Sequence, residues 1–364
     1  MKNKLFKYFY YEPKIKYEFY SEIPYEIKNG LILIHLNIDG SDCKFVFDTG
    51  SKSYIKNQIQ KKMDLRHYFN SASTDANKIK VESEIVLGNL ALGDLKVNNF
   101  KFHTKESFPF DCHNTIDGIL GNDILNQGVF FFDNDAKKLI VTNSINKIDD
   151  LKEFKRLPIK INLGDIILKK NKEVFTLDSG YSYGFILTNR KSFLYNDTCE
   201  SKIFMQNINA LNSSRLKETI YQNGDLCLAG NKYSGIIQFT DGFDTNILGS
   251  YWFFANNIII DIDKKVIYLK KKKIYSINQI SNILNINFSF LNGNVVISGI
   301  SNSISSVKLY DHVLKVNNVD LKDIHSECEL QEVLKSQDKE LGFNLDLKRD
   351  RDTISVFLSK EDLY

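Results

Sequence analysis

The stretch Phe47-Asp48-Thr49-Gly50-Ser51 returns later in the chain as Leu177-Asp178-Ser179-Gly180. Each copy is followed by an Ile-Leu-Gly element, first as Gly118-Ile119-Leu120-Gly121 and then as Asn246-Ile247-Leu248-Gly249. The spacing is 73 positions from Asp48 to Gly121 and 71 from Asp178 to Gly249. One Asp-Thr/Ser-Gly triplet alone is compatible with an ordinary β-turn. Two copies in register, rather than many short repeats, indicate two similar lobes in one chain.

The flanks of the two copies are alike. Residues 31–38, an Asp39-Gly40 turn and residues 44–47 predict a hairpin that places Asp48 at the end of a strand. In the second copy, residues 157–168 are predicted as one strand, 169–172 as a lysine-rich turn and 173–177 as the strand before Asp178. Residues 81–102 alternate and turn at Gly88 and Gly93, which is typical of two or three strands. The chain is therefore predicted to be mainly β.

A few segments have helical spacing, and the pattern changes near the end of the chain. Residues 52–70 predict one short helix, and 189–222 contain similar short pieces. After the lysine run at 270–273, strands are predicted at 286–291, 294–300 and 312–316, helices at 303–308 and 329–336, and a hairpin from 341–348 and 353–358. The expected domains are a lead-in (1–30), a first lobe (31–148), a second lobe (149–272) and a small α+β domain (273–364).

Composition excludes several classes of protein. The chain has 364 residues, a formal net charge of +3 and 12% aromatic residues, which suits a globular protein of two or three domains. The nearly balanced charge gives no reason to expect nucleic acid as a partner. No stretch approaches the roughly 18 apolar residues of a membrane span. Asp111-Cys112-His113, with His103 nearby, has no second spaced ligand pair, so neither a metal nor a cofactor is expected.

The N-terminus and the cysteines bear on the compartment. Residues 1–12 are basic but have neither the apolar stretch nor the cleavage site of a secretory signal. The cysteines form no Cys-x-x-Cys spacing and are odd in number: Cys43, Cys112, Cys199, Cys227 and Cys328. Five free thiols in a reducing compartment are expected, and hence a cytoplasmic protein.

Two carboxylates can hydrolyse an amide without a metal or a nucleophilic serine. At roughly 3 Å two like charges cannot both ionise, so one acid stays protonated while the other activates a water molecule. Asp48 and Asp178 are the candidates for this dyad. Gly50 and Gly180 would let each loop turn tightly, and the hydroxyls of Thr49 and Ser179 are short enough to bond the backbone of the opposite loop. Ser51, Gly121 and Gly249 complete the predicted support, because a glycine lets a second segment pass close to each loop.

At these residues the chain resembles the pepsin-superfamily aspartic peptidases, closest to the retropepsin-like bacterial aspartyl proteases. Residues 22–31 resemble the lead-in of those proteins, and Asp48-Thr49-Gly50-Ser51 with residues 117–123 resemble their two hallmark motifs. The resemblance covers roughly residues 22–270. It implies catalysis by Asp48 and Asp178 within a monomer, since both lobes lie in one chain. Relatives of this type are often exported, so an exported, periplasmic location is the alternative.

The tail is similar to a PDZ domain. Ile283-Leu284-Asn285-Ile286 stands where that family has its carboxylate-binding loop, and residues 309–317 match a second run of the family. The resemblance implies that this domain grips a peptide by adding it to a sheet edge. Asn285 and Tyr310 stand where the family has glycines.

Other departures leave a rival interpretation open. Tyr181 follows the second Asp-Ser-Gly where the family has a small residue, which predicts a less regular loop around Asp178. No glycine-rich flap tip is evident, and residues 72–86 are the candidate flap by position. The leading hypothesis is an aspartic endopeptidase with a peptide-docking tail. The rival is an inactive, protease-like scaffold that binds peptides. A glycosidase is disfavoured, because its two acids stand at least ~5 Å apart and need no paired glycine loops.

Overall fold

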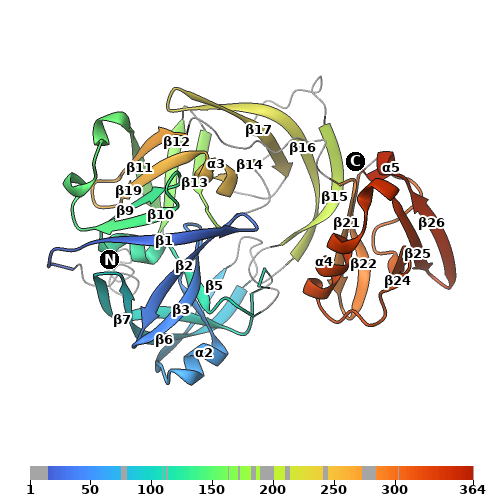
Figure 1. Ribbon diagram of the computed structural model, residues 1–364, viewed down its shortest axis with the longest axis horizontal. Helices are drawn as coiled ribbons and strands as arrows, with labels where there is room; N and C mark the ends of the chain where they lie inside the picture. Colours follow the sequence, from blue (N-terminus) through green and yellow to red (C-terminus); the bar gives the residue numbers. More distant parts are fainter. Residues whose placement is uncertain are drawn as a thin grey trace.

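The computed structural model describes residues 15–74, 80–108, 110–111, 114–162, 164–170, 173–181, 186–188, 201–209, 214–240, 245–272, 284–301 and 303–363. Within these ranges the chain is mainly β, as predicted (Figure 1). None of the helices in the described residues combines the length and the apolar character that crossing a membrane requires.

The first lobe contains β1 (Tyr20–Lys28), β2 (Leu31–Ile38), β3 (Ser41–Phe47), β4 (Tyr54–Lys56), α2 (Asn57–Lys62), β5 (Arg66–Thr74), β6 (Lys80–Leu92), β7 (Leu95–Lys105), β8 (Gly118–Leu120), η1 (Asn122–Gln127), β9 (Val129–Asp133) and β10 (Lys138–Thr142). The 3-10 turns η2 (Ile145–Lys147) and η3 (Leu151–Glu153) lead to the second lobe.

The second lobe contains β11 (Lys155–Asn162), β12 (Asp165–Lys170), β13 (Glu173–Leu177), β14 (Ile186–Thr188), β15 (Ser201–Asn209), β16 (Ser214–Leu228), β17 (Asn231–Thr240), β18 (Asn246–Leu248), α3 (Ser250–Phe254), β19 (Asn256–Asp261) and β20 (Val266–Lys271).

The two lobes repeat one pairing scheme. In the first, β3 pairs in parallel with β8, with Phe47 opposite Leu120. In the second, β13 pairs in parallel with β18, with Leu177 opposite Leu248. β4 lies between β8 and β7 as β14 lies between β18 and β17. The hairpin β5–β6 has its counterpart in β15–β16. Each Asp of the repeat therefore follows a buried strand at the same place in its lobe.

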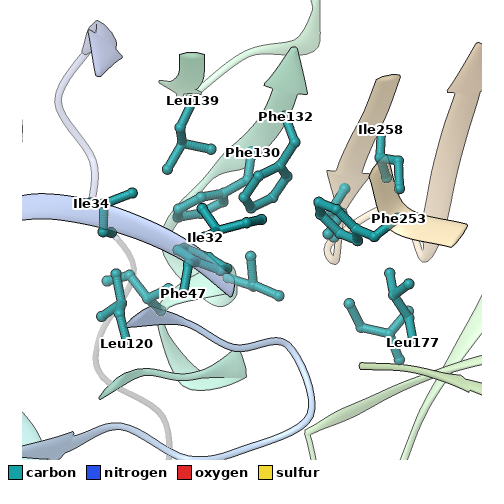
Figure 2. Packing of buried hydrophobic residues seen from close by; sticks show 14 of the residues in the cluster. Ile32, Ile34, Phe47, Leu120, Phe130, Phe132, Leu139, Leu177, Phe253 and Ile258 are labelled. Atoms are coloured by element: carbon teal, nitrogen blue, oxygen red, sulfur yellow. The ribbon is translucent and has the colours of Figure 1, made fainter. Parts of the chain in front are cut away.

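A shared sheet joins the lobes, in the order β1-β10-β9-β19-β20-β11. The central contact is the antiparallel pair β9–β19, in which Phe132 stands opposite Ile258. Aromatic rings continue the contact through the core: Phe132 lies 4.9 Å from Phe47 of the first lobe and 4.9 Å from Phe253 of the second, both edge to face (Figure 2). One apolar core thus runs under both Asp loops, and its burial holds them together.

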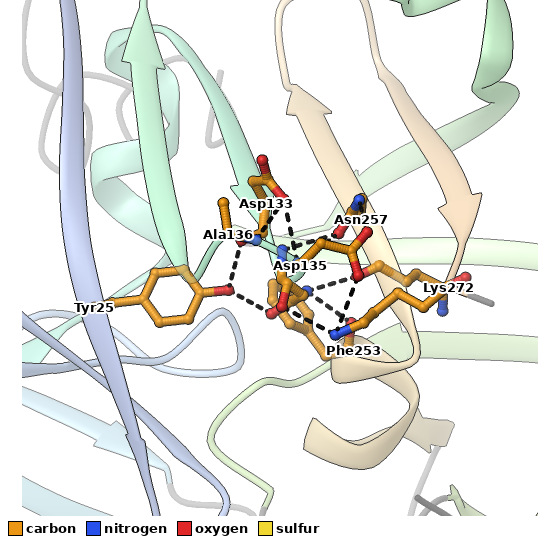
Figure 3. A network of polar contacts seen from close by, with 9 residues as sticks. Tyr25, Asp133, Asp135, Ala136, Phe253, Asn257 and Lys272 are labelled. Atoms are coloured by element: carbon orange, nitrogen blue, oxygen red, sulfur yellow. Dashed lines mark hydrogen bonds and ion pairs between the residues drawn. The ribbon is translucent and has the colours of Figure 1, made fainter. Parts of the chain in front are cut away.

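A buried polar network closes the far end of this junction (Figure 3). The backbone N–H of Asn134 donates to Oδ1 of Asn257 at 2.9 Å, and its amide donates to the carbonyl of Asn256 at 2.6 Å. Nζ of Lys272 donates to the Asn134 carbonyl at 2.9 Å. Buried polar groups that find partners across the junction favour one relative placement of the lobes, because each mismatch would leave an unpaired group.

The C-terminal region has its own apolar core, which includes Ile286, Leu330 and Leu363. Its elements are β21 (Ile286–Leu291), β22 (Asn294–Ser301), β23 (His312–Val316), β24 (Val319–Asp320), α4 (Glu327–Ser336), η5 (Lys339–Leu341), β25 (Phe343–Arg349), β26 (Asp352–Leu358) and α5 (Lys360–Leu363).

This region also continues a sheet of the second lobe. β22 pairs antiparallel with β15, with Phe204 opposite Ser301, Met205 opposite Ile300 and Gln206 opposite Gly299 (Figure 1). The C-terminal region is therefore joined by backbone pairing to the hairpin β15–β16.

Several predicted elements are wrong in detail. Residues 157–168 form two strands rather than one, because the backbone turns at Gly164, whose φ of +102° favours glycine. Gly88 marks a register shift inside a strand, not a turn. The described parts of 189–222 are strands and not helical pieces, and residues 303–308 contain no helix among the positions described there. Long strands are stabilised by partner strands that are distant in sequence. The spacing of apolar residues within one short segment gives no information about those partners.

The expectation of five free thiols is also wrong. Cys43 and Cys227 are free, but Cys328 is disulfide-bonded, and its partner lies outside the described residues. The number and spacing of cysteines do not reveal which of them meet in the fold. Cys112 and His113 lie outside the described residues as well.

Candidate active site

The two aspartates are placed by matching strand ends. The backbone N–H of Asp48 donates to the carbonyl of Leu120 at 2.9 Å, and that of Asp178 donates to Leu248 at 3.0 Å. Each bond continues a parallel strand pair by one residue, so each Asp is held where its strand stops and its loop begins. Both aspartates keep part of their surface exposed.

A reciprocal set of hydrogen bonds joins the two loops. The hydroxyl of Thr49 donates to the Leu177 carbonyl at 3.0 Å and accepts the N–H of Ser179 at 3.0 Å. The hydroxyl of Ser179 donates to the Phe47 carbonyl at 3.1 Å and accepts the N–H of Thr49 at 3.0 Å. Both side chains are fully buried. Each loop thus satisfies the polar groups of the other.

Gly50 and Gly180 lie directly against the opposite carboxylates. A Cβ built on Gly50 would stand 2.3 Å from Cγ of Asp178, and one on Gly180 would stand 2.3 Å from Cγ of Asp48. Any larger residue would push the acid away, so glycine is required by this contact and not only by the turn. The structure therefore brings Asp48 and Asp178 together across the junction, close enough for each carboxyl group to act on the pKa of the other.

The Ile-Leu-Gly elements pass behind the loops. A Cβ on Gly121 would stand 2.3 Å from the backbone carbon of Lys52, so this segment passes as close to its loop as the sequence predicts. The N–H of Asn122 donates to the Ser51 carbonyl at 2.9 Å. In the second lobe the N–H of Ser250, next to the buried Gly249, donates to the Tyr181 carbonyl at 3.0 Å.

The electrostatics of the pair are those of two acids in one site. Burial raises the pKa of Asp48, while the N–H of Gly50 and the hydroxyl of Ser51 act to lower it. Burial raises the pKa of Asp178 well above its ordinary value, and the charge of Asp48 raises it further. Asp48 is therefore the first to ionise, and the proton stays on Asp178, although titration belongs to the pair.

The less regular loop predicted around Asp178 is not found. The N–H of Gly180 donates to Oδ1 of Asp178 at 3.0 Å, as Gly50 does to Asp48 at 2.8 Å. The N–H of Tyr181 adds a bond to the same oxygen at 3.1 Å, and its hydroxyl is bonded to the buried Gln238. Tyr181 fits because its ring is directed to β17 and its backbone alone serves the loop.

Sequence reasoning missed three residues beside the dyad: Lys52, Asn122 and Asp165. Lys52 follows the first Asp-Thr-Gly-Ser directly, but Asp165 lies on the β11–β12 turn of the other lobe. Asn122 stands inside a recognised motif, which was the one available signal. The predicted flap, residues 72–86, falls on the hairpin β5–β6, whose tip at 75–79 lies outside the described residues.

The predicted carboxylate-binding loop is described only in part. Ile283 lies outside the described residues, Leu284 packs against the C-terminal core and Ile286 is buried within it. The N–H of Asn285 donates to the Leu363 carbonyl at 2.7 Å, and its amide donates to the Asp362 carbonyl at 3.1 Å. This backbone donor is thus used by the segment at 362–363.

Part of the first lobe is similar to a known family of proteins. Residues 34–124 match the family model of aspartyl proteases. Among solved structures, Basic 7S globulin from soybean aligns with a TM-score of 0.41 and 10% identity, over 70% of this chain and 96% of that one. A similarity of that size carries no argument about activity. No curated protein matches the chain in sequence.

Proposed function

We propose that this protein is an aspartic endopeptidase in which a water molecule held between Asp48 and Asp178 attacks the peptide bond. The observation that carries the proposal is the contact of each loop glycine with the opposite carboxylate, at 2.3 Å from a built Cβ to Cγ. The reciprocal Thr49–Ser179 bonds support it, because they fix both loops as one rigid unit. The aspartyl protease match to residues 34–124 favours the same chemistry.

The proposed roles follow from the asymmetry of the pair. The N–H of Gly50 donates to Asp48, and the nearby Ser51 hydroxyl also lowers its pKa. Asp48 therefore ionises first and takes a proton from the water as general base. Asp178 keeps its proton and donates a hydrogen bond to the scissile carbonyl, which stabilises the oxyanion as the water oxygen bonds to carbon. When the C–N bond breaks, the proton from Asp48 passes to the leaving nitrogen, and the dyad again holds one proton.

The test compares wild type with Asp48→Asn and Asp178→Asn on a diverse peptide pool across pH, analysed by mass spectrometry. We expect each substitution to abolish cleavage and a statine-containing peptide to inhibit the wild type. Ser51→Ala is the matched control, since it removes one hydroxyl near Asp48 and leaves both acids in place. Cleavage that survives both Asp→Asn substitutions would exclude the dyad.

A second proposal is a peptide-binding adaptor that acts through the C-terminal region. Its support is that β21 pairs with β22 alone among the described strands, which leaves the other edge of β21 facing α4. Two donors near that edge are already used: the N–H of Phe290 by Glu327 at 2.7 Å and the N–H of Asn285 by Leu363. A peptide would have to displace both contacts.

This adaptor role predicts that Glu327→Ala strengthens the binding of a peptide library labelled for fluorescence anisotropy. Gln331→Ala is the matched control, because it removes an amide that donates to Oε1 of Glu327 and leaves Oε2, which accepts the N–H of Phe290, in place. Equal and negligible binding by all three proteins would argue against the adaptor and leave the peptidase proposal untouched.

A further inference from the structure

A polar cluster from both lobes lies at one side of the dyad. Nζ of Lys52 donates to Oδ1 of Asn122 at 3.0 Å, and the amide of Asn122 donates to the Thr49 carbonyl at 3.4 Å. The β11–β12 turn of the second lobe is pressed against this pair: a Cβ on Gly164 would stand 2.4 Å from Nζ of Lys52 and 2.8 Å from Oδ1 of Asn122. Asp165 is the next residue of that turn, and so it stands where the second lobe meets the loop of Asp48.

The carboxylate of Asp165 has no bonded partner among the residues that the structure describes. It is half-buried, and within the described part of the chain no hydrogen bond or ion pair to its carboxylate is found. Burial raises its pKa, the charge of Lys52 lowers it, and the charge of Asp48 raises it. Asp165 thus lies within the electrostatic reach of Asp48. A half-enclosed acid without hydrogen bonds is costly to keep ionised, and a bound cation would offset that cost.

The charges of the cluster favour a cation over an anion. The dyad carries one negative charge, Asp165 a second and Lys52 one positive charge, so the site as a whole is negative. The ammonium of Lys52 is directed to Asn122 and the Gly164 turn, and it leaves the carboxylate of Asp165 without a direct bond. A lysine or arginine side chain entering from the dyad side would supply a charge-assisted hydrogen bond.

We propose that Asp165 is a specificity-determining residue that receives the cationic side chain of a substrate residue close to the scissile bond. The inference rests on the proposed peptidase function and adds a class of substrate: peptides with lysine or arginine at one position beside the cut.

The test uses peptides that differ only by lysine, norleucine or glutamate at each position on either side of one cleavage site. Wild type is expected to cleave the lysine peptide about tenfold better than the norleucine peptide at one position, measured as kcat/KM. Asp165→Asn should lower this ratio to about one. Asp94→Asn, on the exposed β6–β7 turn, is the matched control and should keep the ratio.

The lysine preference should also fade as pH falls through the raised pKa of Asp165, because a protonated acid loses its charge. The charged groups that act on Asp165 are Lys52 and Asp48. The same pH series is therefore measured on the norleucine peptide, so that the titration of the dyad can be distinguished from that of Asp165. A ratio that stays constant over that range would overturn the proposal.

A binding measurement distinguishes failure of this inference from failure of the proposed peptidase function. Statine-centred peptides with lysine or norleucine at the chosen position are titrated by fluorescence anisotropy, which needs no turnover. Cleavage or statine binding without a lysine preference, or with a preference that Asp165→Asn does not change, overturns the inference alone. If neither cleavage nor statine binding occurs, the peptidase proposal fails and the inference fails with it.

Discussion

Replacing Thr49 with valine removes one hydroxyl from the bond set that joins the two Asp loops. Valine has nearly the same shape, so the change is one of hydrogen bonding and not of volume. Two buried backbone groups lose their partner: the N–H of Ser179 and the carbonyl of Leu177, both bonded at 3.0 Å. A buried polar group without a partner costs about 1–3 kcal/mol, so Thr49→Val should cost about 2–6 kcal/mol.

This loss is large beside a net folding free energy of about 5–15 kcal/mol. Thr49→Ser is the control, because it keeps the hydroxyl and removes one methyl group, worth about 0.8 kcal/mol. Ser179→Ala should resemble Thr49→Val, since its hydroxyl makes the reciprocal bonds at 3.0 and 3.1 Å. Cleavage should fall with stability, because the dyad loses its fixed geometry.

The assay is urea unfolding followed by tryptophan fluorescence. Trp252 is the single tryptophan of the chain and is fully buried in the core that runs under both loops. Its emission therefore reports on the two lobes and not on the C-terminal region, which has a separate core. If Thr49→Val were no more destabilising than Thr49→Ser, the reciprocal bonds would not be what holds the loops.

Three further predictions concern the same machinery. Gly180→Ala should lower single-turnover cleavage at least about 100-fold, since its Cβ would stand 2.3 Å from Cγ of Asp48; unchanged cleavage would contradict the close approach. Asp178 binds its proton more tightly when folded, so its ionisation lowers stability as pH rises from 3.8 through the raised pKa. Asp178→Asn should accordingly be more stable than wild type at neutral pH, with the gain vanishing below pH 3.8 in urea melts; a gain independent of pH would refute this linkage. A chain ending at residue 272 should keep the Trp252 transition but be cut faster by added trypsin within β15–β16, as read by mass spectrometry, because β22 no longer covers β15; equal cutting would mean that the pairing protects nothing.

The two Asp loops could be predicted from the sequence because each depends on neighbouring residues and the same pattern occurs twice in the chain. An Asp after a β-prone run, a small hydroxylated residue and a glycine define the loop, and the second copy removes the ambiguity of a chance turn. The hairpins β2–β3 and β25–β26 and the helix α4 were predicted for the same reason, since their turn signals and spacing lie within a few residues.

What escaped prediction depends on contacts between distant residues. The run at 157–168 contains an apolar stretch that suits a continuous strand, and only the fold shows that Gly164 must turn there to meet Lys52. Lys52 and Asp165 are unremarkable as single residues, and nothing local links the end of one loop to a turn in the other lobe. The sequence does not show that Tyr181 fits its loop, because its partner, Gln238, lies on another strand.

The pairing of β15 with β22 limits how this chain can be rearranged. A domain attached by a linker alone can be exchanged for another without regard to its neighbour. Here, removing the C-terminal region would expose to solvent the three residues of β15 that pair with β22. A foreign domain would need a strand of matching register to replace β22. Protein engineers who transplant this C-terminal region would have to move the β15–β16 hairpin with it.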